Sequence, residues 1–425
     1  MTVAFVLDRA AAVLTLAGPH RPRAGKAMGD LCILEDASVA VSDDGRIAWV
    51  GSAHNLDVPG DPPRIDCRGK TILPAFVDAH THLVYAGARK DEMEMRLAGA
   101  DYEAILAAGG GILHTVEATR AAGEDALVAA TLARIDRMRR AGTTTFEIKS
   151  GYGLDLATEL RQLRAARRLS DEHGVRVRTT CLAAHAFPED VRAGRRSRDA
   201  FVDEVCDTIL PAVARENLAD YADVFCDRGA FSVEEARRVL ERARGLGLRL
   251  RVHANELGPT GGAALAAELG AVTADHLLFV DDDDRARLRA AKVTAVLLPG
   301  TSLVLGKPFA DGRAFVEAGV PVAVATDSNP GSCAIESLAL VLALACYGNR
   351  LSPAEAIVAA THNAACTLGL AHEVGRIEPT MAADLVVLAT DDYRDLVYHA
   401  GSPLIEAVYS RGRRVDRPAD ETASP

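Results

Sequence analysis

Three features that mark common classes of protein are missing from this sequence. The eight cysteines include no Cys-x-x-Cys pair and several lie in apolar runs, so we expect buried, reduced thiols in a cytoplasmic protein. The net charge of −11 argues against a nucleic-acid partner, which would need a clustered excess of lysine and arginine. No uninterrupted apolar run reaches about 18 residues, so we expect no membrane helix and no membrane partner.

Two local patterns are absent as well. The first residues, MTVAFVLDRAAAVLTLAG, lack the basic segment of a signal peptide, and an acidic residue interrupts their apolar stretch, which favours a strand. The glycine runs at 107–112 and 260–267 do not lead into Gly-Lys-Ser/Thr, so neither is a phosphate loop. We expect a flexible active-site loop at the first run and close helix packing at the second.

Both ends of the chain are rich in β-strand patterns. Near the start, two alternating apolar runs flank Asp43-Asp44-Gly45, which predicts a hairpin. From about residue 375, ADLVVLAT and IEAVYSRGRRV predict further short strands. Because neither end is long enough to close a core alone, we expect residues 1–72 and 375–425 to form one small β-sandwich domain.

Between these ends the pattern alternates between strand and helix. Ser232 with Glu235, and Ser352 with Glu355, have the spacing of capping boxes at helix starts. Eight strand–helix units over about 250 residues predict a (β/α)8 barrel in residues 73–374, with a doubly wound open sheet as the alternative. The expected strands end in the segments 76–82, 143–150, 176–185, 222–227, 248–255, 271–276, 294–300 and 322–327.

Histidine and aspartate recur at the ends of these strands, where a barrel presents its catalytic rim. His80 and His82 are two residues apart, so on an extended strand they point to the same side. Such a pair alone is a weak signal, but His253 and Asp327 complete a set that suits one Zn²⁺ or Fe²⁺ ion. The ion would lower the pKa of a bound water and make hydroxide available. His185 and His276 end two further strands.

The segments FVDAHTH, VHANE, ADH and ATDSNPG resemble strand-end motifs of the metal-dependent amidohydrolase superfamily. Longer segments from about residue 70 to 335, among them HTHLVYAGARKDEMEMRLAGADYEAILAAGGGI and HANELGPTGGAALAAELGAVTADHL, resemble the imidazolonepropionase family. The resemblance implies hydrolysis of 4-imidazolone-5-propanoate to N-formimidoyl-L-glutamate by a metal-activated hydroxide, in histidine degradation. It also implies a homodimer.

The same resemblance implies roles for individual residues. Glu256, His276 and Asp327 would be catalytic: Asp327 accepts the proton of the water, His276 stabilises the oxyanion, and Glu256 carries protons to the leaving nitrogen. An alternative for Glu256 is that it only orients His253. The substrate-binding positions would be Arg89, Tyr152, His185, Glu256, Asn329, Gly331 and Ser332.

Arg89 invites a carboxylate, although an ion pair with Asp91 or Glu92 is the alternative. The chain departs from the family at Ser332, where threonine is common, and at 301–315, where many relatives are more aromatic. Some amidohydrolases carry a carboxylated lysine between two metals on the fourth strand, but Lys149 ends the second and the fourth has none. We therefore expect one metal ion per chain.

Two other functions remain open at this point. An aminohydrolase that deaminates a purine or related ring would share the metal ligands but would give no reason for Arg89, Tyr152 and TDSNPG. A non-enzymatic barrel would be expected to lose metal ligands, yet all are present. Hydrolysis of imidazolone propionate, generated in place from urocanate by urocanate hydratase, distinguishes the three.

Overall fold

The computed structural model describes residues 2–100 and 110–416, so positions 107–109 of the glycine run at 107–112 lie outside the described residues. Eight parallel strands follow one another in a single sheet, from β6 to β13. Their bounds are Phe76–Asp78 (β6), Thr143–Lys149 (β7), Arg176–Ala184 (β8), Tyr221–Cys226 (β9), Arg249–Ala254 (β10), Thr273–His276 (β11), Thr294–Leu297 (β12) and Val322–Val324 (β13). Each strand coincides with one of the eight expected segments.

The two outer strands of this sheet meet and close it into a barrel. The amide of Asp327 donates to the carbonyl of His80 at 3.1 Å, and the amide of His82 donates to that of Ser328 at 2.9 Å. A parallel bridge joins Thr81 to Ser328 between these bonds. Because this closure follows β6 and β13, it brings the metal-ligand candidates of both strand ends together. The (β/α)8 prediction is confirmed, and the open sheet is excluded.

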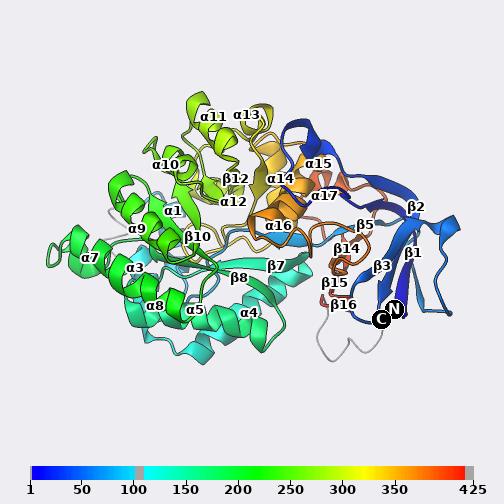
Figure 1. The fold of residues 1–425 in the computed structure, drawn as a ribbon, viewed down its shortest axis with the longest axis horizontal. Coiled ribbons are helices and arrows are strands. Elements are labelled where there is room, and N and C mark those ends of the chain that lie inside the picture. Colours follow the sequence, from blue (N-terminus) through cyan, green and yellow to red (C-terminus); the bar gives the residue numbers. More distant parts are fainter. Residues whose placement is uncertain (1, 101–109, 417–425) are drawn as a thin grey trace.

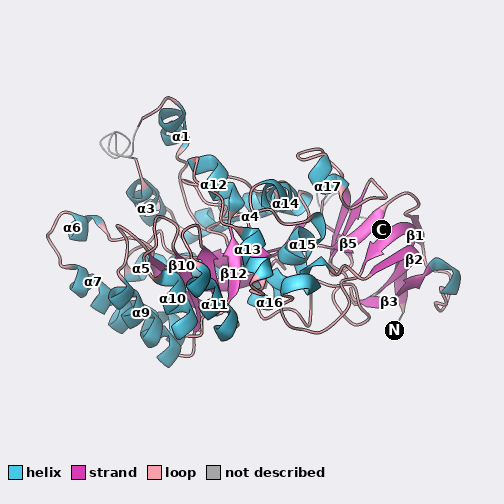
Figure 2. Ribbon diagram, turned by 90° about the horizontal axis from the view of Figure 1, so that it is seen from above, coloured by secondary structure: helices cyan, strands magenta, loops and turns pink. Residues whose placement is uncertain are grey.

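Helices cover the outside of the barrel, as Figures 1 and 2 show. Capping boxes are present at Ser232 with Glu235 and at Ser352 with Glu355, as the sequence predicts. At the second glycine run, a Cβ on Gly262 would lie 3.0 Å from the Cβ of Ala254, so this helix start packs closely on β10. The helices are α1 (Lys90–Leu97), α3 (Ile112–Ala121), α4 (Glu124–Arg140), α5 (Leu156–Asp171), α6 (Glu189–Arg192), α7 (Arg198–Glu204), α8 (Leu210–Arg215), α9 (Val233–Gly245), α10 (Gly262–Glu268), α11 (Asp282–Ala291), α12 (Pro299–Leu305), α13 (Gly312–Glu317), α14 (Leu338–Tyr347), α15 (Pro353–Val358), α16 (Ala364–Thr367) and α17 (Asp395–Tyr398).

Strands from both ends of the chain form a second, mixed sheet beside the barrel (Figure 1). Its order is β16-β15-β14-β5-β1-β2-β3, with β4 also paired to β1. The bounds are Val3–Leu14 (β1), Ile33–Ser42 (β2), Ile47–Ser52 (β3), Arg64–Asp66 (β4), Thr71–Pro74 (β5), Leu385–Leu388 (β14), Ile405–Ser410 (β15) and Arg413–Arg414 (β16).

This sheet folds over on itself around its own core. Phe5 of β1 and Tyr409 of β15 lie three strands apart in the sheet, yet their ring centroids are 5.5 Å apart. A flat sheet would separate them by about 14 Å, since neighbouring strands are about 4.8 Å apart. The predicted strand at the N-terminus and the hairpin at 43–45 are confirmed. Strand β5 of this sheet extends to Pro74, two residues past the expected boundary at 72. The domain boundaries at 72 and 375 stay a prediction.

Other expectations concern the cysteines and membrane helices. All eight cysteines are free thiols, and five of them are buried. In the parts of the chain that the structure describes, no helix is long and apolar enough to cross a membrane.

A buried ion pair joins the barrel to the second sheet. Arg176, at the start of β8, donates to Asp384 just before β14, and its Nε donates to Glu373 at 3.0 Å. The side chains of Arg176 and Asp384 are only 5% and 2% exposed. Asp384 also accepts the backbone amide of Arg411 at 2.8 Å. The pair therefore fixes the C-terminal strands to the end of the barrel at which its strands begin.

We predict that Arg176→Met lowers the free energy of unfolding by about 3 kcal/mol, because it leaves the buried charge of Asp384 without its partner. Urea unfolding measures the change. Arg178→Met, two residues along β8, is the control, because the Arg178 Nε donates to a backbone carbonyl at 3.3 Å. Equal losses in both variants would contradict a special role for the Arg176–Asp384 pair.

Candidate metal centre and active site

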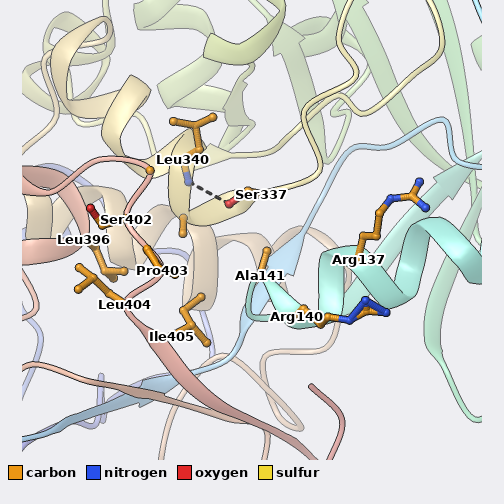
Figure 3. A pocket seen from close by; sticks show the side chains of 12 residues that line it. Arg137, Arg140, Ala141, Ser337, Leu340, Leu396, Ser402, Pro403, Leu404 and Ile405 are labelled. Carbon is orange, nitrogen blue, oxygen red and sulfur yellow. Dashed lines mark hydrogen bonds between the residues drawn. The ribbon is translucent and has the colours of Figure 1, made fainter. Parts of the chain in front are cut away.

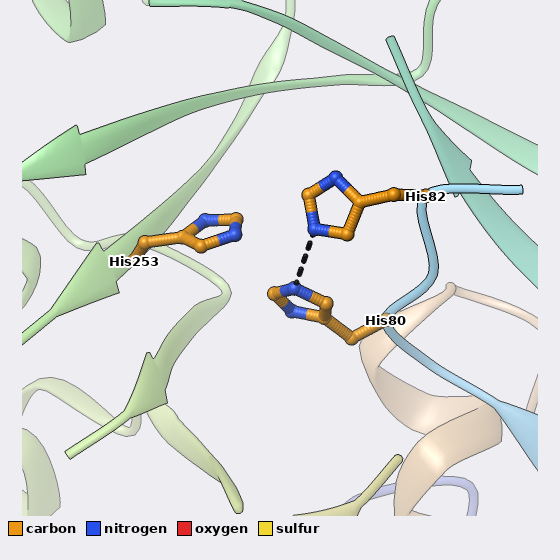
Figure 4. Close-up of side chains that lie close together, drawn as sticks. All are labelled: His80, His82 and His253. Carbon is orange, nitrogen blue, oxygen red and sulfur yellow. Dashed lines mark hydrogen bonds between the residues drawn. The ribbon is translucent and has the colours of Figure 1, made fainter. Parts of the chain in front are cut away.

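Three imidazoles meet at the carboxyl-terminal end of the barrel. His80 and His82 follow β6 and His253 lies in β10, and one ring nitrogen of each lies within 4.8 Å of the others. The Nε2 atoms of His80 and His82 are 3.3 Å apart (Figure 4). The Oδ1 atom of Asp327, from the end of the last strand, lies 3.3 Å from Nε2 of His82 and 3.5 Å from Nε2 of His80.

This spacing fits a single metal ion. Ligand atoms about 2.1 Å from a tetrahedral metal are about 3.4 Å from one another, close to the separations among these side chains. The Nε2 atom of His253 is buried with no hydrogen-bond partner. Buried polar atoms are normally satisfied, so this nitrogen indicates a missing partner. The donor set of three nitrogens and one carboxylate oxygen therefore suits Zn²⁺ or Fe²⁺.

Buried carboxylates contact the Nδ1 atoms of two of the imidazoles. Oδ2 of Asp275 lies 2.6 Å from Nδ1 of His80. Oδ2 of Asp223 lies 2.9 Å from Nδ1 of His253, and its Oδ1 accepts the His253 backbone amide at 3.2 Å. Both contacts leave the Nε2 atoms facing the other ligands, which fixes how each ring is presented to a metal. On the opposite side, the hydroxyl of Thr301 donates to Oδ2 of Asp327 at 2.5 Å.

Lys149 lies among these carboxylates as a paired cation. Its Nζ is 2.9 Å from Glu147, 2.9 Å from Asp223 and 4.0 Å from Asp275. Burial opposes the charged ammonium, but the charges of Asp223 and Glu147 outweigh it and raise the pKa of Lys149. Arg251 adds a second buried cation 3.6 Å from Glu147. Lys149 is the last residue of the second barrel strand, as predicted, and the fourth, β9, contains no lysine.

Glu256 and His276 lie beside the imidazole cluster and have altered acidities. Nε2 of His276 is 3.5 Å from Oε2 of Glu256. Burial, reinforced by the charges of Asp327 and Asp227, raises the pKa of Glu256 to about 8. Burial lowers the pKa of His276 to about 3, so this ring is neutral. One neutral acid and one neutral donor thus stand at the site near pH 7.

Asp227 fixes the backbone that carries Glu256. Its Oδ2 accepts the amides of Glu256 at 2.5 Å and Leu257 at 2.9 Å. Asn255, the residue before, has a left-handed φ of 53°. Its side chain bridges the loops around it, because its amide group donates to the carbonyl of Phe279 and its oxygen accepts the amide of Ala263. These contacts hold a strained turn that aims Glu256 into the site.

Tyr152 and His185 form an aromatic wall on the other side of the cluster. The His185 ring stacks on His82 with centroids 5.0 Å apart and planes 19° apart, and Tyr152 lies 5.4 Å from His185. Nδ1 of His185 is 3.1 Å from the carbonyl of Gly151, so this nitrogen carries the proton and Nε2 is left as an acceptor. Such a wall offers a flat face and one acceptor to a planar ring.

The loop after β13 is folded around Asn329. Its Oδ1 accepts the amides of Gly331 at 2.9 Å and Ser332 at 2.7 Å, and its Nδ2 donates to the carbonyl of Asp327 at 2.7 Å. Arg89 reaches this loop from the other side of the mouth, since the position of a Cβ on Gly331 would be 1.8 Å from Nη1 of Arg89. The predicted substrate residues of the two loops are therefore in contact.

Arg89 also makes the ion pair that the sequence left as an alternative. Its Nε and Nη2 donate to Glu92 at 2.7 and 2.6 Å, in a bidentate pair. The side chains are only 14% and 9% exposed, so this is not a surface salt bridge. The pair leaves Nη1 facing Gly331.

The sequence interpretation missed the buried charges that support the metal ligands. Inside the barrel, Glu147 and Asp223 each contact Lys149, and Asp275 contacts His80. A usable signal was present in each case, because a charge within a barrel strand requires a partner. Glu147 and Lys149, like Arg251 and His253, are two residues apart in one strand and therefore share its inner face.

The cavity that opens between α4, α14 and residues 401–405 has no part in this site. Its volume is about 290 Å³ and its lining includes Arg137, Arg140, Ser337 and Leu404 (Figure 3). None of the lining residues is a predicted functional residue.

Comparisons with known proteins agree with this geometry. The family model described as "Amidohydrolase family" matches residues 71–415. An imidazolonepropionase of Symbiobacterium thermophilum is 46% identical over 97% of this chain and 97% of its own length. One of Geobacillus kaustophilus is 45% identical over 96% of each chain.

Solved structures share the fold at lower identity. A triazine hydrolase variant has a TM-score of 0.71 at 18% identity, covering 98% of this chain and 96% of its own. An adenosine deaminase from Xanthomonas campestris, solved with bound zinc, has a TM-score of 0.67 at 20% identity, covering 97% and 93%.

We predict that Asp275→Asn weakens metal affinity by about 10- to 100-fold, because the His80 ring loses the anion that orients it. Competition with a chelator of known affinity measures the change. Asp282→Asn on α11, where the aspartate side chain is 98% exposed, is the control. An Asp275→Asn protein that binds metal within twofold of wild type would contradict this role.

Proposed function

Because the chain belongs to the imidazolonepropionase family of amidohydrolases, we propose that its barrel mouth is the site at which the ring of 4-imidazolone-5-propanoate is opened. The chain is a hydrolase of histidine degradation that forms N-formimidoyl-L-glutamate. The observation that carries the site assignment is the meeting of His80, His82 and His253 with Asp327 at one end of one barrel.

We infer that one divalent ion, Zn²⁺ or Fe²⁺, is bound by His80, His82, His253 and Asp327. The buried charges support this number. Asp327, Asp275, Asp223 and Glu147 are four carboxylates, and Lys149 and Arg251 are the two cations paired with this network. With neutral imidazoles as ligands, two negative charges remain, which one divalent cation balances. A second ion would leave uncompensated positive charge in a buried site.

When held by these four residues, a divalent ion would act as a Lewis acid and lower the pKa of a water molecule toward neutrality. Asp327 would accept the proton of the attacking water. His276, as a neutral donor, faces the oxygen on which negative charge develops. Glu256, protonated near neutral pH, is the acid that gives a proton to the ring nitrogen when the C–N bond breaks.

The substrate requires a second kind of contact, because its propionate carries a negative charge. We propose that Arg89 binds this carboxylate, with Tyr152 and the Asn329–Ser332 loop around it. His185 offers Nε2 to an N–H group of the ring. A ring deaminase would use the same imidazoles but would leave the cation at the mouth without a purpose. Turnover of imidazolone propionate, produced in place by urocanate hydratase, tests the proposal directly.

Two further properties are proposals that the family resemblance suggests. The cytoplasm, where thiols stay reduced, suits eight free cysteines. A homodimer is expected, and light scattering of the purified chain measures it.

We predict that metal analysis gives about one Zn or Fe per chain, and that chelation abolishes hydrolysis until either ion is restored. Two tightly bound ions per chain would contradict the charge balance. Apo-protein that retains wild-type turnover would contradict metal dependence.

We predict that Glu256→Gln lowers kcat by at least about 10²-fold, because the amide cannot give a proton to the leaving nitrogen. Metal content should stay at the wild-type level, since Glu256 is not among the proposed ligands. Steady-state kinetics and metal analysis of the same preparation provide the test. A loss of metal together with activity would instead support the alternative in which Glu256 only orients His253.

A further inference from the structure

We propose that Glu92 and Gly331 are positioning residues that aim Arg89, so that the enzyme selects a substrate by the distance between its reacting amide and its carboxylate. The inference rests on the proposed function and adds residues to it. Metal binding and proton transfer explain neither the buried carboxylate of Glu92 nor the absence of a side chain at position 331.

Glu92 holds one edge of the Arg89 guanidinium. Its two oxygens accept Nε at 2.7 Å and Nη2 at 2.6 Å, which is the geometry of a bidentate pair. The amide of Gly111 donates to Oε2 at 2.8 Å, so Glu92 is itself fixed from a second segment of chain. Nη1 makes no hydrogen bond among the residues that the structure describes, so Nη1 and the remaining hydrogen of Nη2 form the edge that we assign to a substrate carboxylate.

Gly331 determines where that open edge lies. A Cβ at this position would be 1.8 Å from Nη1, 2.5 Å from Cζ and 3.1 Å from Nη2 of Arg89. No side chain fits there without displacing the guanidinium. The backbone of Gly331 is not in the left-handed region, so alanine would be tolerated by the backbone itself. Glycine at this position therefore allows the Arg89 guanidinium to approach the loop closely.

The same loop connects Arg89 to the metal ligands. The Gly331 amide donates to Asn329, and Asn329 donates to the carbonyl of Asp327. Arg96 of α1 donates to the Gly331 carbonyl at 3.1 Å, which ties α1 to the loop a second time. The open edge of Arg89 is thereby held at a fixed distance from Asp327. A fixed cation and a fixed metal site together recognise one length of acidic side chain.

The test is a mutant cycle with wild type, Gly331→Ala, Arg89→Ala and the double variant on 4-imidazolone-5-propanoate. Gly331→Ala should raise KM by about 30-fold, with kcat within about threefold, because it displaces the cation and not the metal. Arg89→Ala should lower kcat/KM by about 10²-fold, and adding Gly331→Ala to it should change kcat/KM by less than about twofold. Metal content should be unchanged throughout.

A substrate analogue and a second variant separate positioning from a general structural effect. On the 5-propyl analogue, in which a methyl group replaces the carboxylate, Gly331→Ala and wild type should differ by less than about twofold. Glu92→Gln should raise KM for the acid by about 10-fold only when Arg89 is present, and Glu94→Gln on the exposed side of α1 is its matched control.

Each outcome decides a different point. Independent, multiplying losses for Gly331→Ala and Arg89→Ala, or equal losses on both compounds, would overturn the inference while wild-type turnover leaves the proposed function standing. A lower KM in Glu92→Gln would show that Glu92 competes with the substrate for Arg89, and would also overturn it. A wild type that does not hydrolyse the acid would overturn the proposed function, and the inference with it.

Discussion

The site depends on a buried ammonium group between two carboxylates. Lys149 lies 2.9 Å from Asp223 and 4.0 Å from Asp275, and these aspartates contact the imidazoles of His253 and His80. Buried carboxylates without a counter-ion would be costly, so the cation allows both to remain charged beside the metal-ligand candidates. The order of the strands makes this possible, because β7, β9, β10 and β11 each contribute inward side chains to one level of the barrel.

Strand ends carried most of the information that the sequence provided. Each metal-ligand candidate stands where an apolar strand stops, and that position is visible in the sequence because the pattern changes there. Two of the three carboxylates near Lys149 could not be identified from the sequence. Glu147 shares β7 with Lys149, but Asp223 and Asp275 come from β9 and β11. Which charges pair across a barrel depends on its closure and register, and a single sequence contains no direct record of either.

Arg89 shows a different reason why sequence alone was insufficient. Its ion pair with Glu92 and its proposed contact with a carboxylate appeared to be alternatives, but the guanidinium has two edges and each can serve one partner. Likewise, the backbone turns at Asn255, His276 and Asp327 have left-handed φ values of 53°, 74° and 52°. Non-glycine residues adopt such values only when surrounding contacts impose them, and all three lie where a strand delivers a functional side chain.

The barrel therefore separates two tasks between two levels. The lower level of paired charges holds the imidazoles that could bind a metal. The upper level includes Arg89 and the loop at Gly331, and there we propose that one ring is distinguished from another. Structural neighbours named for triazine and adenosine share the fold at TM-scores of 0.71 and 0.67. Since a common fold does not determine the substrate, the loops that hold Arg89 and Gly331 are where we propose that the specificity of this chain arises.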